Sequence, residues 1–228
     1  MNIVLVDEMG ISYRDAKSLQ KALNFFIALV CSAWGKAVPS LSWATNTTGA
    51  DIVPKNGDWL VYITERNRGK PGVKGHHGKA MNGVIVAYCS LKAVGGNLFG
   101  RYHRPLMKLG KTFGVASFMG EGLVTTLAHE IAEMLCDSNL DQYSDKDKNG
   151  LRWLVEVCDP IEGCYLKFTD AERDLDCVLP DIVTPAFYKL DGVAPFALAH
   201  SVTAPFTQSA KGEAYGLDPM GKLVKVSK

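Results

Sequence analysis

One stretch, residues 123–137, constrains the fold of this chain more than any other. Its apolar side chains recur at helical spacing and form one stripe, made of Leu123, Leu127, Ile131, Met134 and Leu135. His129, Glu133 and Asp137 follow one another at four-residue intervals, so in a helix they stack along a second face. The stretch therefore predicts a helix over about residues 122–140, with a buried side and a side that carries polar chemistry.

Shorter patterns place other elements around this helix. Apolar periodicity predicts a long helix over residues 13–34, and short apolar runs predict strands at 3–6, 41–45, 59–64, 83–89 and 151–157. This order predicts an α/β or α+β fold, in which a small mixed sheet is followed by the ligand-bearing helix and a β-rich C-terminal portion. We expect one folding unit, with a core over residues 1–140 and a C-terminal subdomain over residues 141–228.

The segments between these elements are polar or rich in glycine. Residues 66–82 are basic, which predicts a mobile, solvated loop where His76 and His77 could bind a metal only adventitiously. A polar loop is expected at 141–150. Other expected features are a short helix or turn near 104–109, and a final hairpin between 214–215 and 223–226.

Composition excludes several classes of protein. The net charge of +1 gives no reason to expect binding to nucleic acid or to an anionic membrane. The N-terminus lacks a basic segment followed by a long apolar one, so no signal peptide is expected. Cys158, Cys164 and Cys177 are close enough in sequence to pair, but the absence of a secretion signal favours free thiols.

His129 and Glu130 begin a motif that carries metal chemistry. In the H-E-x-x-H arrangement two histidines one turn apart bind zinc, and the glutamate after the first histidine is the general base. Here Glu133 replaces the second histidine, so His129 and Glu133 are candidate ligands and Glu130 is the candidate base. An ordinary amphipathic helix with a charged outer face is the alternative.

A zinc hydrolase needs a third protein ligand, which we expect downstream of the helix. Glu156 and Asp159 are the best candidates, whereas Asp137 is an alternative ligand or a partner that orients one. A ligand set with two carboxylates weakens the Lewis acidity of the ion and shifts preference from Zn²⁺ toward harder ions such as Mn²⁺ or Ca²⁺.

A second motif competes for one of these residues. The spacing of an EF-hand calcium loop is matched by Asp145, Asp147, Asn149, Leu151 and Glu156. However, the residues after Gly150 predict a strand where an EF-hand has a helix, so a polar turn is the alternative. Glu156 can hardly serve both sites, so calcium in this loop would leave Asp159 as the third ligand of the other.

Three segments resemble zincin-like, metallopeptidase-like proteins of bacteriophages and prophages, here with HExxE in place of HExxH. They read Ala-His-Glu-Ile-Ala-Glu-Met-Leu-Cys-Asp at 128–137, Val-Glu-Val-Cys-Asp-Pro-Ile-Glu-Gly at 155–163 and Val-Leu-Pro-Asp-Ile-Val-Thr-Pro-Ala-Phe-Tyr at 178–188. The order of elements is also similar to that of the zincins. The resemblance implies a metal-dependent hydrolase of phage origin that acts on a peptide or protein in the host cytoplasm or the virion. It leaves as an alternative a catalytically silent virion protein with a stabilising metal site, whose partners are other virion proteins.

Overall fold

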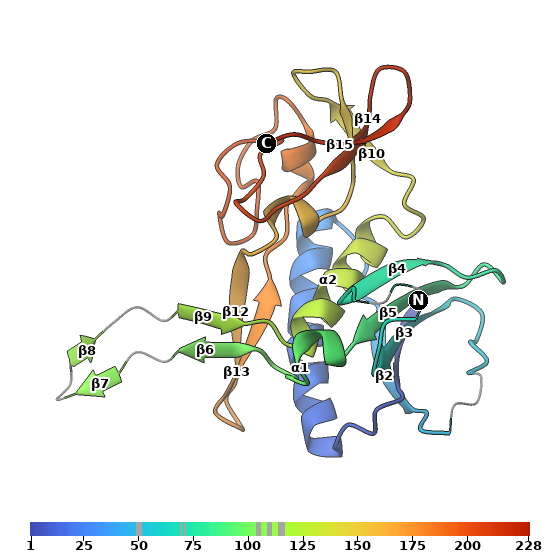
Figure 1. Ribbon diagram of the computed structural model, residues 1–228, viewed down its shortest axis with the longest axis vertical. Coiled ribbons are helices and arrows are strands. Elements are labelled where there is room, and N and C mark those ends of the chain that lie inside the picture. The colour runs from blue at the N-terminus through green and yellow to red at the C-terminus, as the bar shows by residue number, and fades with distance from the viewer. Residues whose placement is uncertain (49–51, 69, 71, 104–105, 109–110, 114–116) are drawn as a thin grey trace.

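A computed structural model describes residues 1–48, 52–68, 70, 72–103, 106–108, 111–113 and 117–228 of the chain (Figure 1). Within these residues the protein has a mixed α+β fold, with two α-helices and five small sheets, which confirms the predicted fold class at this coarse level. Neither α-helix of the described chain is long and apolar enough to cross a membrane. All six cysteines are free thiols, as predicted.

The main sheet supports the rest of the molecule. Its strands lie in the order β2-β1-β3-β5-β4, with bounds Ser40–Thr45, Asn2–Asp7, Asp58–Thr64, Ile85–Ser90 and Gly75–Lys79. The first four strands are parallel, and β4 is added antiparallel at one edge. Because side chains alternate along a strand, Ile3 and Leu5 of β1 point into the helix-covered core, and Val6 belongs to a small cluster elsewhere.

Helix α1, Tyr13–Trp34, has the bounds that the sequence predicted. Ser12 caps it, because its hydroxyl accepts a hydrogen bond from the backbone N–H of Asp15, and Gly35 ends it in the left-handed conformation at φ 61°. Its apolar stripe is buried, and includes Leu19, Leu23, Phe26, Ile27 and Val30. The helix therefore forms for local reasons and then supplies a large part of the core.

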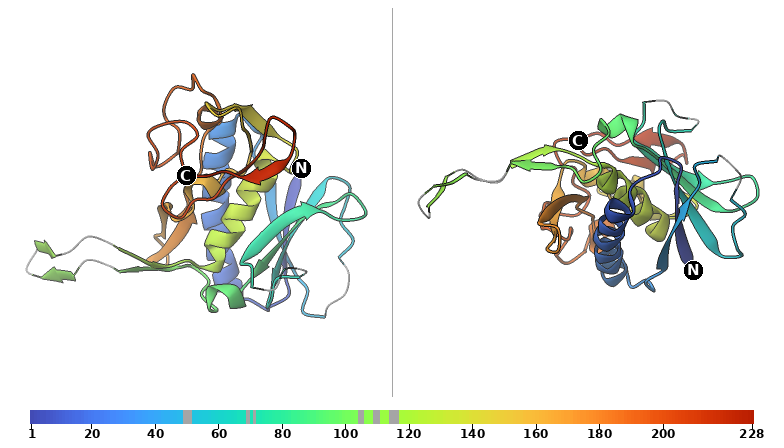
Figure 2. Two further views of the ribbon diagram at one scale, coloured as in Figure 1. Left: turned by 45° about the horizontal axis from the view of Figure 1, so that its top comes forward. Right: turned by 90° about the horizontal axis from the view of Figure 1, so that it is seen from below.

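Helix α2, Leu123–Cys136, lies beside α1, with the main sheet on one side and the β12–β13 hairpin on the other (Figure 2). Every residue of α2 except His129 is buried. The helix is shorter than predicted because the Asp137 carboxylate accepts hydrogen bonds from the backbone N–H groups of Asp141 and Gln142, and so turns the chain away. A polar stripe in so buried a helix must find partners within the protein.

The C-terminal part forms a four-stranded sheet and a separate hairpin. The sheet has the order β10-β11-β14-β15, with bounds Tyr143–Lys146, Arg152–Leu154, Tyr215–Leu217 and Leu223–Lys225, and the hairpin consists of β12, Tyr165–Asp170, and β13, Leu175–Pro180. Strands β14 and β15 confirm the predicted final hairpin. Trp153 and Phe187 pack in the same continuous core as α1 and α2, so the core includes residues from both sides of residue 140.

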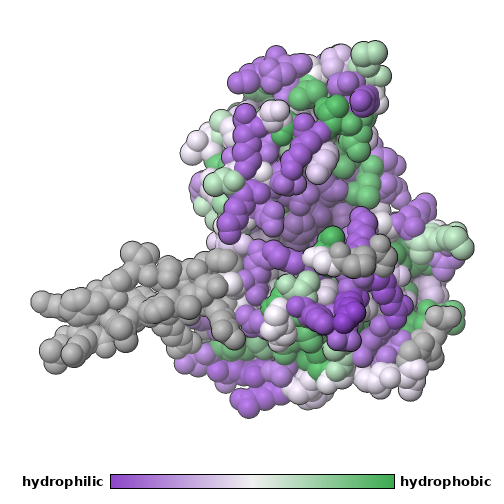
Figure 3. Space-filling view, in the orientation of Figure 1, coloured by the Kyte–Doolittle hydropathy of each residue, from purple (hydrophilic) through white to green (hydrophobic). Residues whose placement is uncertain are grey.

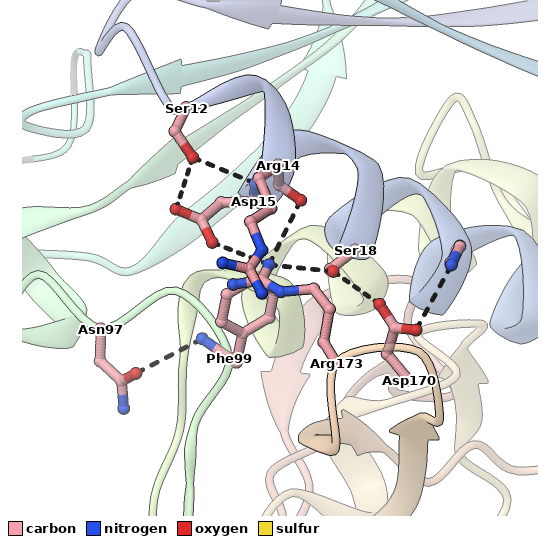
Figure 4. Close-up of polar contacts among 9 residues, drawn as sticks. Ser12, Arg14, Asp15, Ser18, Asn97, Phe99, Asp170 and Arg173 are labelled. Atoms are coloured by element: carbon pink, nitrogen blue, oxygen red, sulfur yellow. Dashed lines mark hydrogen bonds and ion pairs between the residues drawn. The ribbon is translucent and has the colours of Figure 1, made fainter.

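A partly buried polar cluster connects the β12–β13 hairpin to α1 (Figure 4). Arg173, in the turn of the hairpin, donates to Asp15 Oδ1 at 2.9 Å and to Ser18 Oγ at 3.0 Å. Ser18 in turn donates to the buried carboxylate of Asp170 at 2.6 Å. Hydrogen bonds that involve a charged group are stronger than neutral ones, so this cluster fixes where β13 packs against α2.

Several predicted boundaries are wrong. The expected loop at 66–82 contains β4, and the expected loop at 141–150 contains β10. The strand expected at 151–157 is only Arg152–Leu154, because the chain then turns toward the short 3₁₀ helix η2, Asp159–Ile161.

The described residues between 91 and 120 form one 3₁₀ helix and short strands. The elements are η1, Lys92–Val94, and β6 to β9, with bounds Arg101–His103, Leu106–Lys108, Lys111–Phe113 and Ser117–Gly120. Strand β6 pairs with β9, and β7 pairs with β8. The helix or turn expected at 104–109 is therefore wrong for 106–108, and its other residues lie outside the described part.

Candidate metal centre

A cavity of about 500 Å³ lies between α2, β4 and the chain that follows β11. The hollow between the C-terminal part and the main sheet is largely hydrophilic at its surface (Figure 3). Among the described residues, three histidines and seven carboxylates line the cavity. Those that come closest to one another are His77, His129, Glu130, Glu133 and Asp159, with Glu156 in the same wall. This volume is typical of a site for a small molecule or for a short piece of a larger one.

His129 stands at the centre of the first group of ligands. Its Nε2 lies 3.0 Å from Glu133 Oε1 and 3.1 Å from Asp159 Oδ1. Helix α2 places Glu133 one turn beyond His129, whereas Asp159 arrives from η2. The sulfur of Cys158 is also close, since one ligand atom each from His129, Glu133 and Cys158 lie within 4.8 Å of one another.

The contact between His129 and Glu133 is not an ordinary hydrogen bond. Glu133 is only 3% exposed, and its Oε1 has no hydrogen-bond partner although it lies 3.0 Å from His129 Nε2. Two ligand atoms that each lie about 2.1 Å from one ion are about 3.0–3.4 Å apart in octahedral or tetrahedral geometry. The observed separation fits two atoms that share a cation.

His77, on β4, faces the other side of the same helix. Its Nδ1 lies 3.2 Å from Glu130 Oε2 and 3.6 Å from Glu133 Oε2, and the residue is 8% exposed. His77, Glu130 and Glu133 form a second group whose ligand atoms lie within 4.8 Å of one another. Glu133 therefore belongs to both groups.

Burial and mutual repulsion dominate the protonation of these carboxyl groups. Burial, together with the negative charges of Asp159 and Glu130, raises the pKa of Glu133 to about 7, although His129 opposes the shift. Burial and the charge of Glu133 raise the pKa of Glu156 to about 10. Burial lowers the pKa of His129, but the negative charge of Glu133 and the other groups around the ring, Asp159 among them, together outweigh burial, and the pKa stands well above its ordinary value. Carboxylates crowded in this way hold protons or a cation.

The predicted downstream ligands both reach the cavity. Asp159 approaches His129 directly, and its side chain is 34% exposed. Glu156 lies in the wall, where its Oε2 is buried and has no hydrogen-bond partner. Asp137, in contrast, closes the end of α2 with both of its oxygens and does not line the cavity, so its carboxylate has a structural role.

The predicted calcium loop is arranged differently from an EF-hand. Asp147 Oδ1 accepts hydrogen bonds from the backbone N–H groups of Asn149 and Leu151, and Oδ2 accepts one from the Trp153 indole at 3.0 Å. Glu156 lines the cavity of His129, and none of Asp145, Asp147 and Asn149 does so among the described residues. The bonding of Asp147 therefore supports the polar-turn alternative.

His77 is the member of the centre that the sequence did not single out as a ligand. Its neighbours on β4 are glycine, histidine and lysine, so no apolar alternation signals a strand. The residue is buried because β4 pairs with β5 and packs on α2. The one sequence signal for a ligand at this position is the residue type itself, since His77 is one of five histidines in the chain.

Gly75 allows β4 to approach α2 closely. A Cβ atom at this position would collide with the carboxylate of Glu130 and with Thr126 Cγ2, whereas a Cβ at Gly78 would meet nothing within 4 Å. Neither glycine adopts a positive φ, so alanine is acceptable to the backbone at both. The small residue at 75 is therefore required by the contact with Glu130.

We expect Gly75→Ala to displace Glu130 and to destabilise the protein by about 1–3 kcal/mol, as overpacking usually does. Thermal unfolding measures the loss, and calorimetric titration with Mn²⁺ measures the accompanying loss of cation affinity. Gly78→Ala on the same strand is the matched control and is expected to leave both unchanged. Equal effects of the two substitutions would contradict the close contact.

Comparisons of the chain with protein-family models, with curated proteins and with solved structures find no significant match. The class of protein that the structure itself defines is a mixed α+β protein with a carboxylate-rich and histidine-containing cavity. Its function is therefore inferred from the cavity.

Proposed function

We propose that this protein is a zincin-like, metal-dependent hydrolase of the peptidase type, with a divalent cation held by His129, Glu133 and Asp159. The observation that supports it most directly is the convergence of Glu133 Oε1 and Asp159 Oδ1 on His129 Nε2, at 3.0 and 3.1 Å. Two elements distant in sequence bring these three atoms to the wall of one cavity.

The donor set suits Zn²⁺ or Mn²⁺. One imidazole nitrogen and two carboxylate oxygens are ligands that both ions accept, and the two negative charges favour the harder Mn²⁺. The buried, unpartnered Oε1 of Glu133 is what a bound cation would satisfy. When bound, the ion would supply Lewis acidity to a water molecule and to the carbonyl group of a substrate.

Glu130 is the proposed general base. It is 5% exposed and lies one residue from His129 on the wall of the same cavity. His77 Nδ1, 3.2 Å from Glu130 Oε2, holds the carboxyl group in place. In this position Glu130 would take a proton from the attacking water and return it to the leaving amine.

The proposed substrate is a peptide or a protein segment. The cavity of about 500 Å³ is large enough for the scissile group and neighbouring atoms, but not for a folded partner. The resemblance of residues 122–188 to phage and prophage proteins supports a phage origin and a place in the host cytoplasm or the virion.

The test is hydrolysis of a library of fluorogenic peptides by the Mn²⁺- or Zn²⁺-loaded protein. We expect Glu130→Gln to reduce the rate by about 100-fold or more, which is the usual contribution of a general base, with the fold and the His129-bound ion retained. Glu162→Gln is the control, since it makes the same chemical change at a half-exposed position of the same cavity.

Two results would contradict the proposal. One is a metal-loaded wild-type protein that hydrolyses no peptide, which would favour a structural role for the metal site. The other is a Glu130→Gln variant as active as the wild type.

A further inference from the structure

The carboxylate of Glu133 lies between two histidines. Its Oε1 is 3.0 Å from His129 Nε2, and its Oε2 is 3.6 Å from His77 Nδ1. Glu130 Oε2 is also near the second histidine, at 3.2 Å from Nδ1. One oxygen of Glu133 is thus available on each side, which is the arrangement of a carboxylate that bridges two cations about 3.5–4 Å apart.

Buried polar atoms without partners lie in the same wall. Among the described residues that line the cavity they are His76 Nδ1, His77 Nε2, Glu133 Oε1, Glu156 Oε2 and Asp181 Oδ2. A buried polar atom without a partner is destabilising, so five of them around one cavity indicate that a bound group is needed.

Among the described residues, the carboxyl groups nearest Glu133 have no lysine or arginine beside them. Seven carboxylates of the described residues line the cavity, and among the described ion pairs no lysine or arginine reaches four of them, Glu130, Glu133, Glu156 and Asp159. The nearby Lys74 pairs with Glu121 and Glu162. A divalent ion on each side of Glu133 would place positive charge beside both of its oxygens.

We propose that a second divalent cation binds beside the first, held by His77, Glu130 and Glu133, with Glu133 bridging the two ions. The inference rests on the proposed function only for the first ion, at His129. In the metal-free protein His77 Nδ1 and Glu130 Oε2 contact each other directly at 3.2 Å, and the second cation would lie between them and Glu133. While that cation is bound, Glu130 is a ligand, so hydrolysis should be fastest when only the His129 site is filled.

The test is a titration of the full chain with Mn²⁺ alone, followed by calorimetry, elemental analysis and electron paramagnetic resonance. We expect about two Mn²⁺ ions per chain and a spectrum of magnetically coupled ions, as a carboxylate bridge requires. His77→Ala should bind about one ion and give the spectrum of isolated Mn²⁺. His76→Ala, on the same strand but outside the cluster, should bind about two.

A second variant distinguishes the loss of a metal ligand from misfolding of the protein. His77→Asn keeps an amide N–H near the position of Nδ1, so it can still donate to Glu130, but it lacks the imidazole ligand. It should also bind about one ion. One ion in the wild type, two ions in both His77 variants, or two uncoupled ions would overturn the proposal. If the proposed hydrolase function is wrong, peptide hydrolysis would be absent, but the number of Mn²⁺ ions bound per chain would be the same.

Discussion

Removal of divalent cations at pH 8 is expected to lower the melting temperature of this protein by about 10 °C. A ligand present at a thousand times its dissociation constant stabilises the folded state by about 4 kcal/mol, and a chain of this size loses about 2–4 °C for each kcal/mol. The effect should be large here because the cation neutralises carboxylates that the fold itself buries, above all Glu133 at 3% exposure. Differential scanning calorimetry with and without a chelator measures it.

Glu133→Gln distinguishes the contribution of the bound cation to stability from the contribution of the rest of the fold. The amide has nearly the same shape as the carboxylate but no charge, so it removes repulsion from Glu130 and Asp159 and weakens cation binding. At pH 8 we expect the metal-free variant to be more stable than the metal-free wild type, and added Mn²⁺ to stabilise it much less.

Glu172→Gln is the control, because Glu172 is exposed and pairs only with Lys21 among the described residues. It should respond to the chelator as the wild type does. An unchanged melting temperature of the wild type after chelation would show instead that the centre is a polar cluster that needs no cation.

The parts of the fold that the sequence predicted are those set by local patterns. The apolar period of α1, together with Ser12 before it and Gly35 after it, determines both of its ends. The stripe of α2 likewise predicts a helix with His129 and Glu133 on one side. The helix ends earlier than this stripe predicts, because the Asp137 carboxylate accepts hydrogen bonds from the backbone N–H groups of Asp141 and Gln142.

The parts of the site that the sequence did not predict depend on contacts between segments that are distant in sequence. His77 is buried because β4 pairs with β5 and lies on α2, and no pattern within 66–82 encodes that. The choice between Glu156 and Asp159 depends on the turn that leads into η2, which brings Asp159 to His129 and leaves Glu156 in the wall. Asp147 matched a calcium ligand by spacing, yet the indole of Trp153 and two backbone N–H groups occupy its oxygens.

The stability of the metal-free protein is expected to fall as the pH rises from 5 to 8. The pKa of Glu133 is raised from 4.5 to about 7 in the folded state, mainly by burial, so between these values the folded protein binds more protons than the unfolded chain. Stability therefore decreases with pH across this window. Glu156, with a pKa raised to about 10, extends the decrease above pH 7.

The histidines of the centre act in the same direction. The pKa values of His77 and His129 are raised above 6.5, so their stabilising contribution is complete below that pH and is lost as the pH rises through their folded-state values. Carboxyl groups whose pKa is lowered, such as Asp170 beside Ser18, lose their contribution only below about pH 4. His76 acts in the opposite direction below pH 6.5, because burial lowers its pKa, but it is one group against the four whose pKa is raised, Glu133, Glu156, His77 and His129.

A loss on the order of 2 kcal/mol, or about 5 °C in melting temperature, is expected between pH 5 and pH 8. Thermal melts in chelator at a series of pH values measure it. Excess Mn²⁺ should reduce or reverse the slope, because a cation binds the deprotonated ligands and its affinity rises with pH. Glu133→Gln should show a smaller slope in chelator, since it lacks one of the groups that titrate.

A metal-free wild type that becomes more stable between pH 5 and pH 8 would mean that these carboxyl groups are already ionised and paired in the folded state. In that case the cavity would have no excess negative charge for a cation to neutralise.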